Sequence, residues 1–488
     1  MRVLFASSEV YPLVKTGGLA DVSGALPAAL IEGGQDVRVL LPGYAQAMDK
    51  AEGKRQVASL GDPLGVGAEA RLVSAKLPDS GVPVWLIDCP ALYHRAGGPY
   101  QDVDGSDYAD NALRFGLLSW AAARLCTADS PVKWRPHVLH CHDWQTGLAP
   151  AYLKAWQTED RPATVFTIHN IAYQGQFLAD TVPRLGLPWD FYHMQGLEYW
   201  DTMSFLKAGL VYSDKLTTVS PRYAKEIQAA PHGCGMEGVL ADRAADLTGI
   251  LNGADYGVWD PATDVRLAHP YPALDYVAGK AANKAALQAE LGLEQKPDAP
   301  LLVIVSRLND LKGMDMVLAV LPTILSQGAQ LAVVGTGDRA LEDGFKAVAA
   351  ANPAQIAVTI GYSETLAHKL MAAGDMLVMP SRFEPCGLTQ FYAMRYGTIP
   401  VVHVTGGLAD TVVDTTYDGL MTGTATGFAF EHANAGAFQW TLERALGMYR
   451  QPEQWRKVQL SCVTQDFTWG RSASRYVDLY RSLTGGTV

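Results

Sequence analysis

The chain has 488 residues, more than a single hydrophobic core usually supports, and its length therefore predicts two or three domains. Hydrophobic residues make up 48% and charged residues 18%, which is typical of a globular protein, and no apolar run is long enough to span a membrane. The formal net charge of −11 disfavours nucleic acid as a partner and means that an anionic ligand would need local lysines and arginines.

The start of the chain, MRVLFASSEVYP, combines a short apolar run with Glu9 and lacks a cleavage pattern, which indicates a first strand rather than a signal peptide. The 6 cysteines form no CxxC pair and have no regular spacing. This pattern favours reduced thiols and a cytoplasmic location over disulfides or a zinc site.

Short apolar runs alternate with helix-like segments along the chain. In the first half these runs lie at 3–6, 37–41, 84–87, 138–141, 164–168, 216–219 and 250–251. In the second half they lie at 301–305, 331–334, 356–360, 376–379, 399–404 and 428–430. Continuous runs of this kind are typical of parallel strands covered by helices on both faces. Two such series predict an α/β protein with two doubly wound, Rossmann-like domains.

The stretch LNGADYGVWDPATD lies between the two series and is rich in Gly, Asp and Pro, which indicates a linker. We therefore expect an N-terminal domain at 1–250 and a C-terminal domain at 251–467. The segment 468–488 is predicted to form a final helix, whose apolar face carries Ala473, Tyr476, Tyr480 and Leu483.

The hexapeptide TGGLAD occurs at 16–21 and again at 405–410, each time after a predicted strand and before a predicted helix. Glycine lets a backbone approach a ligand closely, and the first N–H groups of a helix favour an anion. Lys15 precedes the first copy, which suits a phosphate, whereas Val404 precedes the second copy, which is equally compatible with a tight turn. Neither copy matches GxGxxG or a Walker A loop, so a nicotinamide enzyme is disfavoured.

Two further cations, Arg307 and Lys312, follow the first strand of the second half. Ligands of open parallel sheets bind beyond the carboxyl ends of the strands. Together with Lys15 these side chains form a candidate site for a nucleotide diphosphate, with ligands from both domains. The sequence therefore predicts a cleft shared by the two domains.

A metal site is a competing interpretation for two segments. His140 and His142 flank Cys141 on one predicted strand, but no third ligand stands at metal spacing. The motif at Asp102–Asp104 imitates the acidic motif of metal-dependent glycosyltransferases, although its polar surroundings are more typical of a solvated loop.

Two other segments also allow a different chemistry. Asp143 and Glu384 could form a glycosidase pair, which depends on a separation that sequence does not give. Cys386 could be a nucleophile, although the backbone amide beside Gly387 is the better candidate for a ligand contact.

Several stretches resemble one known family along nearly the whole chain: KTGGLADVSGALP, HDWQTGL, HNIAYQGQF, LNGADY, SRLNDLKG and SRFEPCGLTQ. Together they are similar to the bacterial glycogen synthases and the related starch synthases. The resemblance implies a GT-B fold of two facing Rossmann-like domains with the active site in the cleft between them, and a final segment that crosses back to the first domain. It also implies retaining transfer of glucose from a nucleotide donor, usually ADP-glucose, to the non-reducing end of an α-1,4-glucan such as glycogen, with release of ADP and no cofactor.

The resemblance assigns roles to the residues at matching positions. The catalytic set would be Glu384, His169, Lys15, Arg307 and Lys312. The donor-binding set would be Lys15, Gly18, His169, Asn252, Arg307, Lys312, Tyr362, Glu384, Cys386, Gly387, Leu388 and Thr389. The acceptor side would be lined by Tyr100, Asp143 and Trp144. No residue is assigned to a metal, so we expect fixed cations and amide dipoles to stabilise the departing diphosphate.

Within these sets the resemblance also implies individual contacts. Lys15 and Gly18 would contact phosphates or glucose, and Thr389 a phosphate. His169 and Asn252 would address the sugar, whereas Tyr362 would stack on the base.

One position departs from the wider retaining superfamily, in which a Glu is followed by seven residues and a second Glu. Here the position that follows Glu384 and seven intervening residues is occupied by Tyr392. The second carboxylate's contact, expected at the donor ribose, is therefore absent or replaced, with Gln390 as a candidate.

Other functions stay open at this point: a UDP-glucose-using synthase, another sugar-nucleotide enzyme of the same fold such as an epimerase, and a non-catalytic glucan-binding protein. Four retained residues speak against the last of these: Lys15, Arg307, Lys312 and Glu384. The oligomeric state cannot be derived from the sequence.

Overall fold

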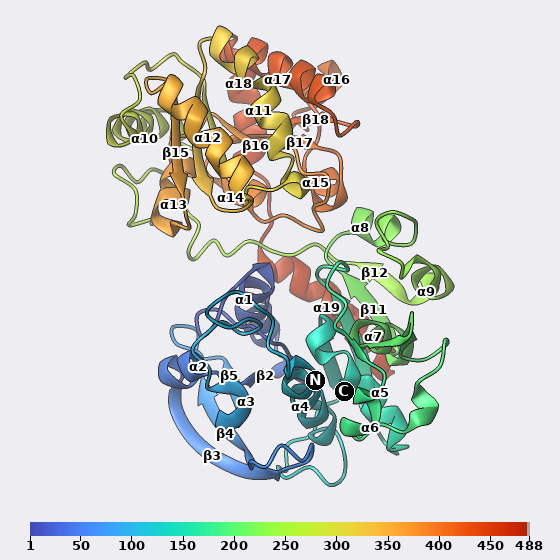
Figure 1. The fold of residues 1–488 in the computed structure, drawn as a ribbon. Helices are drawn as coiled ribbons and strands as arrows, with labels where there is room; N and C mark the ends of the chain where they lie inside the picture. The colour runs from blue at the N-terminus through green and yellow to red at the C-terminus, as the bar shows by residue number, and fades with distance from the viewer. Residues whose placement is uncertain (486–488) are drawn as a thin grey trace. The chain divides into compact units, whose positions relative to one another are not determined.

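The computed structural model describes residues 1–485. They divide into two compact units: unit 1 consists of Met1–Gly253 together with the C-terminal helix that starts at Trp469, and unit 2 consists of Ala254–Thr468. In Figure 1, unit 1 runs from blue to green and includes the red helix α19 (Trp469–Thr484), and unit 2 runs from yellow-green to orange-red. Each unit has its own sheet, and each is described separately.

The main sheet of unit 1 has 9 strands within the described residues. Its order is β12 (Leu247–Gly249), β11 (Lys215–Thr218), β7 (Ala163–Ile168), β6 (Val138–His142), β1 (Arg2–Ala6), β2 (Asp36–Pro42), β5 (Pro83–Asp88), β4 (Ala70–Lys76) and β3 (Glu52–Gly61). The strands from β12 to β5 are parallel, as their continuous apolar runs predict. Residues 3–6 of β1 are fully buried, because elements cover both faces of the sheet at its centre.

The structure differs from the predicted strands of unit 1 in three places. β12 ends at Gly249 instead of covering 250–251. β4 pairs antiparallel with β5, and β3 pairs antiparallel with β4 at the edge of the sheet. Neither strand was predicted, and β3 is polar, with only its Leu60 buried. A small antiparallel sheet of β8 (Gln176–Leu178), β10 (Thr202–Ser204) and β9 (Glu198–Tyr199) was also not predicted, because strands this short have no recognisable alternation.

Helices pack on the sheet of unit 1. They are α1 (Gly18–Glu32), α2 (Ala45–Lys50), α3 (Pro90–Tyr93), α4 (Asn111–Arg124), α5 (Leu148–Ala155), α6 (Thr181–Arg184), α7 (Phe205–Tyr212), α8 (Pro221–Glu226) and α9 (Glu237–Asp242), followed by α19 at the end of the chain. The final helix contacts α1 and β7, and it buries Tyr476 and Tyr480 of its apolar face. The hydroxyl of Tyr480 lies 2.7 Å from Nδ1 of His140 on β6, which ties the end of the chain to the centre of the sheet.

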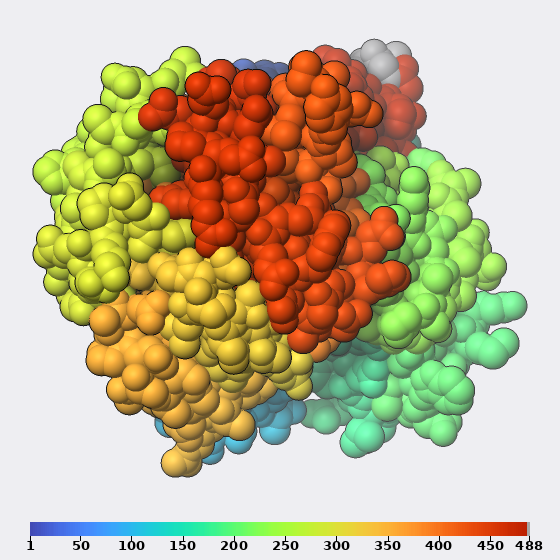
Figure 2. All heavy atoms as spheres, turned by 90° about the horizontal axis from the view of Figure 1, so that it is seen from above, coloured from blue at the N-terminus to red at the C-terminus, as the bar shows by residue number. Residues whose placement is uncertain are grey.

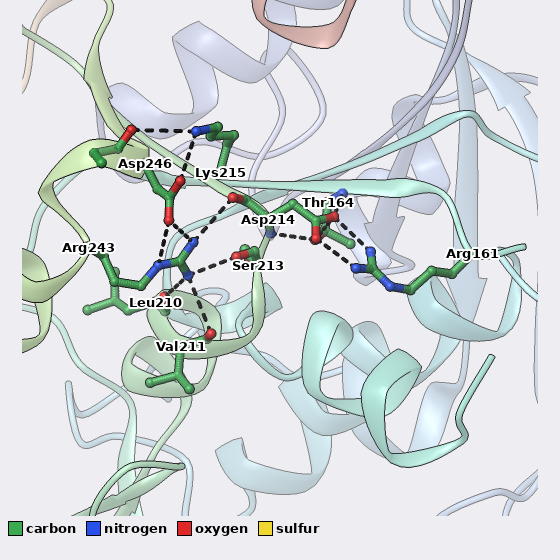
Figure 3. Close-up of polar contacts among 10 residues, drawn as sticks. Arg161, Thr164, Leu210, Val211, Ser213, Asp214, Lys215, Arg243 and Asp246 are labelled. Carbon is green, nitrogen blue, oxygen red and sulfur yellow. Dashed lines mark hydrogen bonds and ion pairs between the residues drawn. The ribbon is translucent and has the colours of Figure 1, made fainter. Parts of the chain in front are cut away.

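A polar cluster holds together the amino ends of β7 and β11 (Figure 3). Arg161 donates two hydrogen bonds of 2.7 Å to the carboxylate of Asp214, which also accepts hydrogen bonds from Thr164. Burial raises the pKa of Asp214, but these donors outweigh it and hold the pKa below its usual range. Arg243 donates to carbonyl groups at the end of α7 and to Asp246, which also pairs with a lysine of β11. The charges of this cluster are therefore committed to holding strands in place.

The sheet of unit 2 is parallel throughout its 6 strands in the described chain. Its order is β15 (Ile356–Ile360), β14 (Gln330–Gly335), β13 (Leu301–Val305), β16 (Met376–Met379), β17 (Ile399–His403) and β18 (Phe428–Phe430). Leu302 and Ile304 of β13 pack into one buried cluster, and Leu301 and Val303 pack into another. Alternate residues of this strand thus face two cores, which is the doubly wound arrangement that the sequence predicts.

Helices cover both faces of this sheet. They are α10 (Tyr276–Leu291), α11 (Met314–Ser326), α12 (Arg339–Ala351), α13 (Glu364–Ala373), α14 (Thr389–Arg395), α15 (Gly406–Thr411), α16 (Tyr417–Thr422), α17 (Ala435–Tyr449) and α18 (Pro452–Val463). α17 contacts α11 and α18, and the orange-red atoms of this region lie on the surface of unit 2 in Figure 2. Among the described residues, no helix has both the length and the apolar character needed to cross a bilayer.

Candidate functional site

The loop between β1 and α1 is organised by the buried carboxylate of Glu9. Oε2 of Glu9 accepts hydrogen bonds from the backbone N–H groups of Thr16 (2.5 Å) and Gly17 (3.2 Å). Oε1 accepts hydrogen bonds from the Thr16 hydroxyl and from the hydroxyl of Tyr100, both at 2.5 Å. Burial raises the pKa of Tyr100, so its hydroxyl remains a donor. Glu9 therefore fixes the first TGGLAD turn, and Tyr100, predicted on the acceptor side, supports it.

The glycines of the first TGGLAD turn face open space. A Cβ atom added at Gly17 or Gly18 would meet no atom within 4 Å. α1 begins at Gly18, and its N-cap residue, Gly17, has no side chain that could cap the first N–H groups. Lys15 is about one-third exposed and pairs with Asp21 at 2.7 Å. A ligand could therefore approach the backbone of this turn closely, with a lysine beside it.

The second TGGLAD turn has a different role. Gly406 has a φ of +44°, and a Cβ atom there would lie 2.0 Å from the carbonyl oxygen of Glu384. A Cβ atom at Gly407 would lie 2.1 Å from the carbonyl oxygen of Cys386. The N–H of Gly407 also donates to the Glu384 carbonyl at 3.1 Å. These glycines serve close packing against the 384–386 loop, which selects the tight turn among the two interpretations left open by the sequence.

Unit 2 brings Lys312 and Glu384 into direct contact. Nζ of Lys312 lies 2.5 Å from Oε2 of Glu384, and the same oxygen accepts a hydrogen bond from the Ser381 hydroxyl at 3.0 Å. Asn309 caps the 3₁₀ turn Asp310–Lys312 by accepting a hydrogen bond from the N–H of Lys312. Glu384 is buried, with 8% of its surface exposed, so its charge is held by these two partners.

Arg307 is placed differently from Lys312. It follows β13 directly and is exposed. Within residues 1–485 it has no hydrogen bond or ion pair, so its charge is available to a ligand.

The loop between Glu384 and α14 is shaped by Gly387 and Gln390. Gly387 has a φ of +72°, which favours glycine. The side-chain amide of Gln390 is buried and donates to the carbonyl groups of Cys386 (3.0 Å) and Gly387 (3.2 Å). Leu388 is the N-cap of α14, which begins at Thr389. Gln390 therefore holds the loop in shape, and its amide is directed to the loop's own backbone.

The position of the superfamily's second Glu lies in an aromatic stack. The ring of Tyr392 stacks on Trp259 with a centroid distance of 4.1 Å and an interplanar angle of 3°. Trp259 also stacks on His368, with a centroid distance of 3.6 Å. Tyr362, predicted to stack on the base, is 76% exposed, and its hydroxyl donates to Glu364 at 3.3 Å.

In unit 1, the carboxyl ends of β6 and β7 bring His142, Asp143 and His169 together. Oδ1 of Asp143 accepts a 2.7 Å hydrogen bond from the N–H of His169, and Nε2 of His169 lies 2.9 Å from Nδ1 of His142. Asp143 has a φ of +55°, a strained conformation that turns its carboxylate onto the next strand end. Burial raises the pKa of Asp143 to about 7 and lowers the pKa of His169 to about 3, so His169 is neutral.

The remaining predicted residues of unit 1 lie near these strand ends. Trp144 packs edge-on against Phe115 at 4.9 Å, and a Cβ atom at Gly175 would lie 2.2 Å from its ring. Tyr100 also contacts Phe115, at 5.7 Å. Asn252 is buried and follows β12, and its Oδ1 has no hydrogen-bond partner among the described residues. An unpartnered buried amide oxygen is a ready acceptor for a ligand hydroxyl.

The competing interpretations find less support. No group of three or more His, Cys, Asp or Glu side chains in residues 1–485 is arranged to hold a metal ion. Asp102 and Asp104 are exposed, and each accepts a hydrogen bond from a backbone N–H two residues ahead. The Asp143 carboxylate is occupied by backbone donors, as a structural carboxylate would be.

Sequence reasoning missed Glu9, Ser381 and Trp259 as parts of these clusters. Each follows a strand or lies in the linker as an ordinary polar or aromatic residue, and only the folded chain shows its partner. Glu9 alone carried a signal, because a carboxylate directly after a buried strand needs donors.

Comparisons with known proteins connect these clusters to a family. Residues 2–242 match the family described as starch synthase catalytic domain, and residues 290–459 match glycosyl transferases group 1. The chain is 72% identical over 485 residues to a glycogen synthase of Paramagnetospirillum magneticum, which covers 99% of this chain and 98% of that protein. It is 52% identical to a glycogen synthase of Aromatoleum aromaticum, over 98% of this chain and 96% of that protein.

A solved structure agrees with the sequence comparisons. The catalytic domain of starch synthase IV from Arabidopsis thaliana, bound to ADP and acarbose, matches with a TM-score of 0.88 and 32% identity, over 99% of each chain. The predicted α/β fold of the GT-B type is confirmed by this match and by the two family matches. The chain therefore belongs to the glycogen synthase family of glucosyltransferases.

Proposed function

We propose that the chain transfers glucose from ADP-glucose to the non-reducing end of an α-1,4-glucan, with retention at the anomeric carbon and release of ADP. The observation that carries this proposal is the Lys312–Glu384 pair. Lys312 follows β13, as the uncommitted Arg307 does, and Glu384 follows the neighbouring strand β16. Two cations suit a diphosphate, and an acceptor-only carboxylate suits sugar hydroxyls, which donate. The relatives named glycogen synthase and the starch synthase bound to ADP support the same donor and acceptor.

We assign the donor's phosphates to the two cations Arg307 and Lys312. Arg307 is exposed and uncommitted, and Lys312 exchanges its ion pair with Glu384 for the diphosphate when the donor binds. Glu384, then held by Ser381, accepts hydrogen bonds from glucose hydroxyls together with the backbone of 386–388. In unit 1, the open turn at Gly17 and Gly18 lets the same ligand approach the backbone closely, with Lys15 beside it.

His169 and Asn252 address the sugar. His169 is neutral because burial lowers its pKa to about 3, so it offers a hydrogen bond without adding a positive charge next to the oxocarbenium-like sugar. The unpartnered Oδ1 of Asn252 accepts from a hydroxyl. Tyr100 and Trp144 lie against Phe115 and are assigned to the acceptor side, whereas Tyr362 is assigned to the base.

Charge separation dominates the reaction. The bond between the anomeric carbon and the diphosphate oxygen breaks, and negative charge grows on the diphosphate while the sugar becomes positive. Fixed cations and helix-start amides stabilise that charge, at about 2–4 kcal/mol for each well-placed contact. The 4-hydroxyl of the glucan then bonds to the same face of the anomeric carbon, and its proton passes to the departing diphosphate. Retention follows without a covalent intermediate on the protein.

The donor is tested by offering ADP-glucose and UDP-glucose separately with glycogen. We expect chain extension with ADP-glucose at a much higher kcat/KM than with UDP-glucose. Preference for UDP-glucose would contradict the assigned donor, and glucan binding without extension by either donor would contradict transfer.

We also assign the reaction to the cytoplasm, since all 6 cysteines, which lie in the described part of the chain, are free thiols.

A further inference from the structure

The side chain of His142 makes one hydrogen bond, and that bond goes to His169. His142 ends β6 and His169 follows β7, and these strands are parallel neighbours. Nδ1 of His142 lies 2.9 Å from Nε2 of His169. His142 is fully buried, and its Nε2 has no hydrogen-bond partner in the described chain. His142 is thus within hydrogen-bond distance of His169 and is the more deeply buried of the two.

The packing around His142 is apolar or already satisfied. The ring of Phe5 stacks on it at 3.9 Å with an interplanar angle of 27°. The ring of His140 lies 4.0 Å away, and both of its nitrogens are used by the hydroxyls of Tyr480 and Thr167. Within the described residues, nothing beside Nε2 of His142 accepts a hydrogen bond.

This arrangement distinguishes two tautomers of the histidine pair. A neutral imidazole carries one N–H donor and one bare acceptor nitrogen. If His169 donated from Nε2, then His142 would carry its proton on Nε2, as a buried N–H without an acceptor, which proteins avoid more strictly than an unpartnered acceptor. If His142 donates from Nδ1, its Nε2 is only a bare lone pair. Burial lowers the pKa of both histidines, so a doubly protonated ring does not compete near neutral pH.

We infer that His142 is a positioning residue that donates from Nδ1 to Nε2 of His169 and thereby fixes His169 as its Nδ1–H tautomer. Nδ1 of His169 has no protein partner in the described chain and, unlike Nε2 of His142, is not sealed from solvent. It therefore presents an N–H donor to an oxygen of the bound sugar. The inference rests on the proposed function only for the identity of that sugar.

The direct test is the tautomer itself, read from the full-length protein labelled with ¹⁵N-histidine. A long-range ¹H–¹⁵N spectrum separates a pyrrole-type from a pyridine-type ring nitrogen, and the His169→Gln spectrum identifies the His169 signals among the 11 histidines. We expect a pyrrole-type Nδ1 and a pyridine-type Nε2 for His169. A pyrrole-type Nε2 on His169 would overturn the inference.

Matched variants test the consequence. His142→Asn keeps an amide donor near the position of Nδ1, and His142→Leu has nearly the same shape without a donor. We expect His142→Asn to keep both the His169 tautomer and kcat, and His142→Leu to mix the tautomers and lower kcat roughly tenfold with KM for both substrates little changed. An unmixed Nδ1–H tautomer and full kcat in His142→Leu would contradict the positioning role. If His142→Leu does not fold, the wild-type spectrum still decides.

The inference and the proposed function fail in different ways. A protein without transfer from ADP-glucose but with the expected His169 spectrum would contradict only the proposed function. A protein with normal transfer and the opposite tautomer would contradict only the inference.

Discussion

Nζ of Lys312 lies 2.5 Å from Oε2 of Glu384, so two side chains assigned to opposite ends of one donor neutralise each other in the free protein. The pair keeps a buried carboxylate satisfied until a ligand replaces the lysine. In the proposed mechanism donor binding breaks this ion pair, which would link recognition of the phosphates to release of the carboxylate that accepts from the sugar.

Glu384→Gln tests the sugar-binding half of this link. The amide keeps the shape but replaces an acceptor oxygen with a donor, so kcat and kcat/KM should fall together by roughly 10²–10³-fold. ADP affinity should stay the same or increase, because Lys312 loses its partner. Steady-state kinetics and calorimetric ADP titration measure both, with exposed Glu431→Gln as the control. A loss confined to KM for glycogen would be incompatible with this role.

Glu9→Gln tests the first TGGLAD turn. Glu9 accepts hydrogen bonds from the backbone of Thr16 and Gly17, and an amide would set a donor against these N–H groups. The free energy of unfolding should fall by about 1–3 kcal/mol, and KM for ADP-glucose should rise. Glu32→Gln, at the exposed end of α1, should change neither. An unchanged KM with reduced stability would show that the turn does not contact the donor.

Ligands of parallel sheets bind beyond the carboxyl ends of the strands, and this rule explains how much of the site the sequence could predict. Lys15, Arg307 and Lys312 were found because long apolar runs mark the strand ends that precede them. Glu9 was not found, because its donors come from a turn that folds back onto it. In the same way, the sequence located the departure at Tyr392, but its partner Trp259 is remote in the chain and is recognised only in the folded unit.

The repeated hexapeptide shows a second limit. Identical letters predict the same turn, yet the first pair of glycines meets open space and the second pair meets the carbonyl groups of Glu384 and Cys386. What distinguishes the copies is the neighbouring chain, which the local sequence does not encode. Continuous apolar strands were predictable for the converse reason: β13 is buried on both faces, so its composition reflects its environment, whereas the polar edge strand β3 has no such signature.

Tyr480→Phe tests how the final helix is anchored. Removal of the hydroxyl leaves Nδ1 of His140 without its 2.7 Å partner in the centre of the sheet. The free energy of unfolding should fall by about 1–3 kcal/mol. Chemical denaturation followed by circular dichroism measures the change, and Tyr417→Phe, at an exposed tyrosine, serves as the control. Equal stability of the two variants would contradict an anchoring role.

The buried histidines predict acid sensitivity. Burial lowers the pKa of His140 and His169 to about 3 and that of His142 well below its usual range. As pH falls below the unfolded value of about 6.5, the unfolded chain binds these protons and the native chain does not, so stability is lost. Asp143 has the opposite effect, because burial raises its pKa to about 7. Below that pH the native carboxyl is protonated, whereas the unfolded chain takes up the same proton only when the pH falls to about 4. Between these two values the Asp143 proton therefore favours the native state as the pH falls.

His140→Gln isolates one of these protons. Near pH 5, the slope of unfolding free energy against pH should be smaller than in the wild type by about 1.4 kcal/mol per pH unit. Denaturant titrations of the variant and the wild type across the acidic range measure this difference in slope. A His140→Gln slope equal to that of the wild type would mean that His140 is protonated in the native state.

We propose retaining glucosyl transfer from ADP-glucose in which protein cations, rather than a metal ion, stabilise the departing diphosphate. The most direct test of this proposal is the proton NMR spectrum of a reaction of the full-length protein with ADP-glucose and a short α-1,4-glucan in excess EDTA. We predict one new α-1,4 anomeric signal for each ADP released, at the same rate with and without magnesium. A β-anomeric signal, ADP release without chain extension, or activity that vanishes in EDTA and returns with a divalent cation would contradict the account.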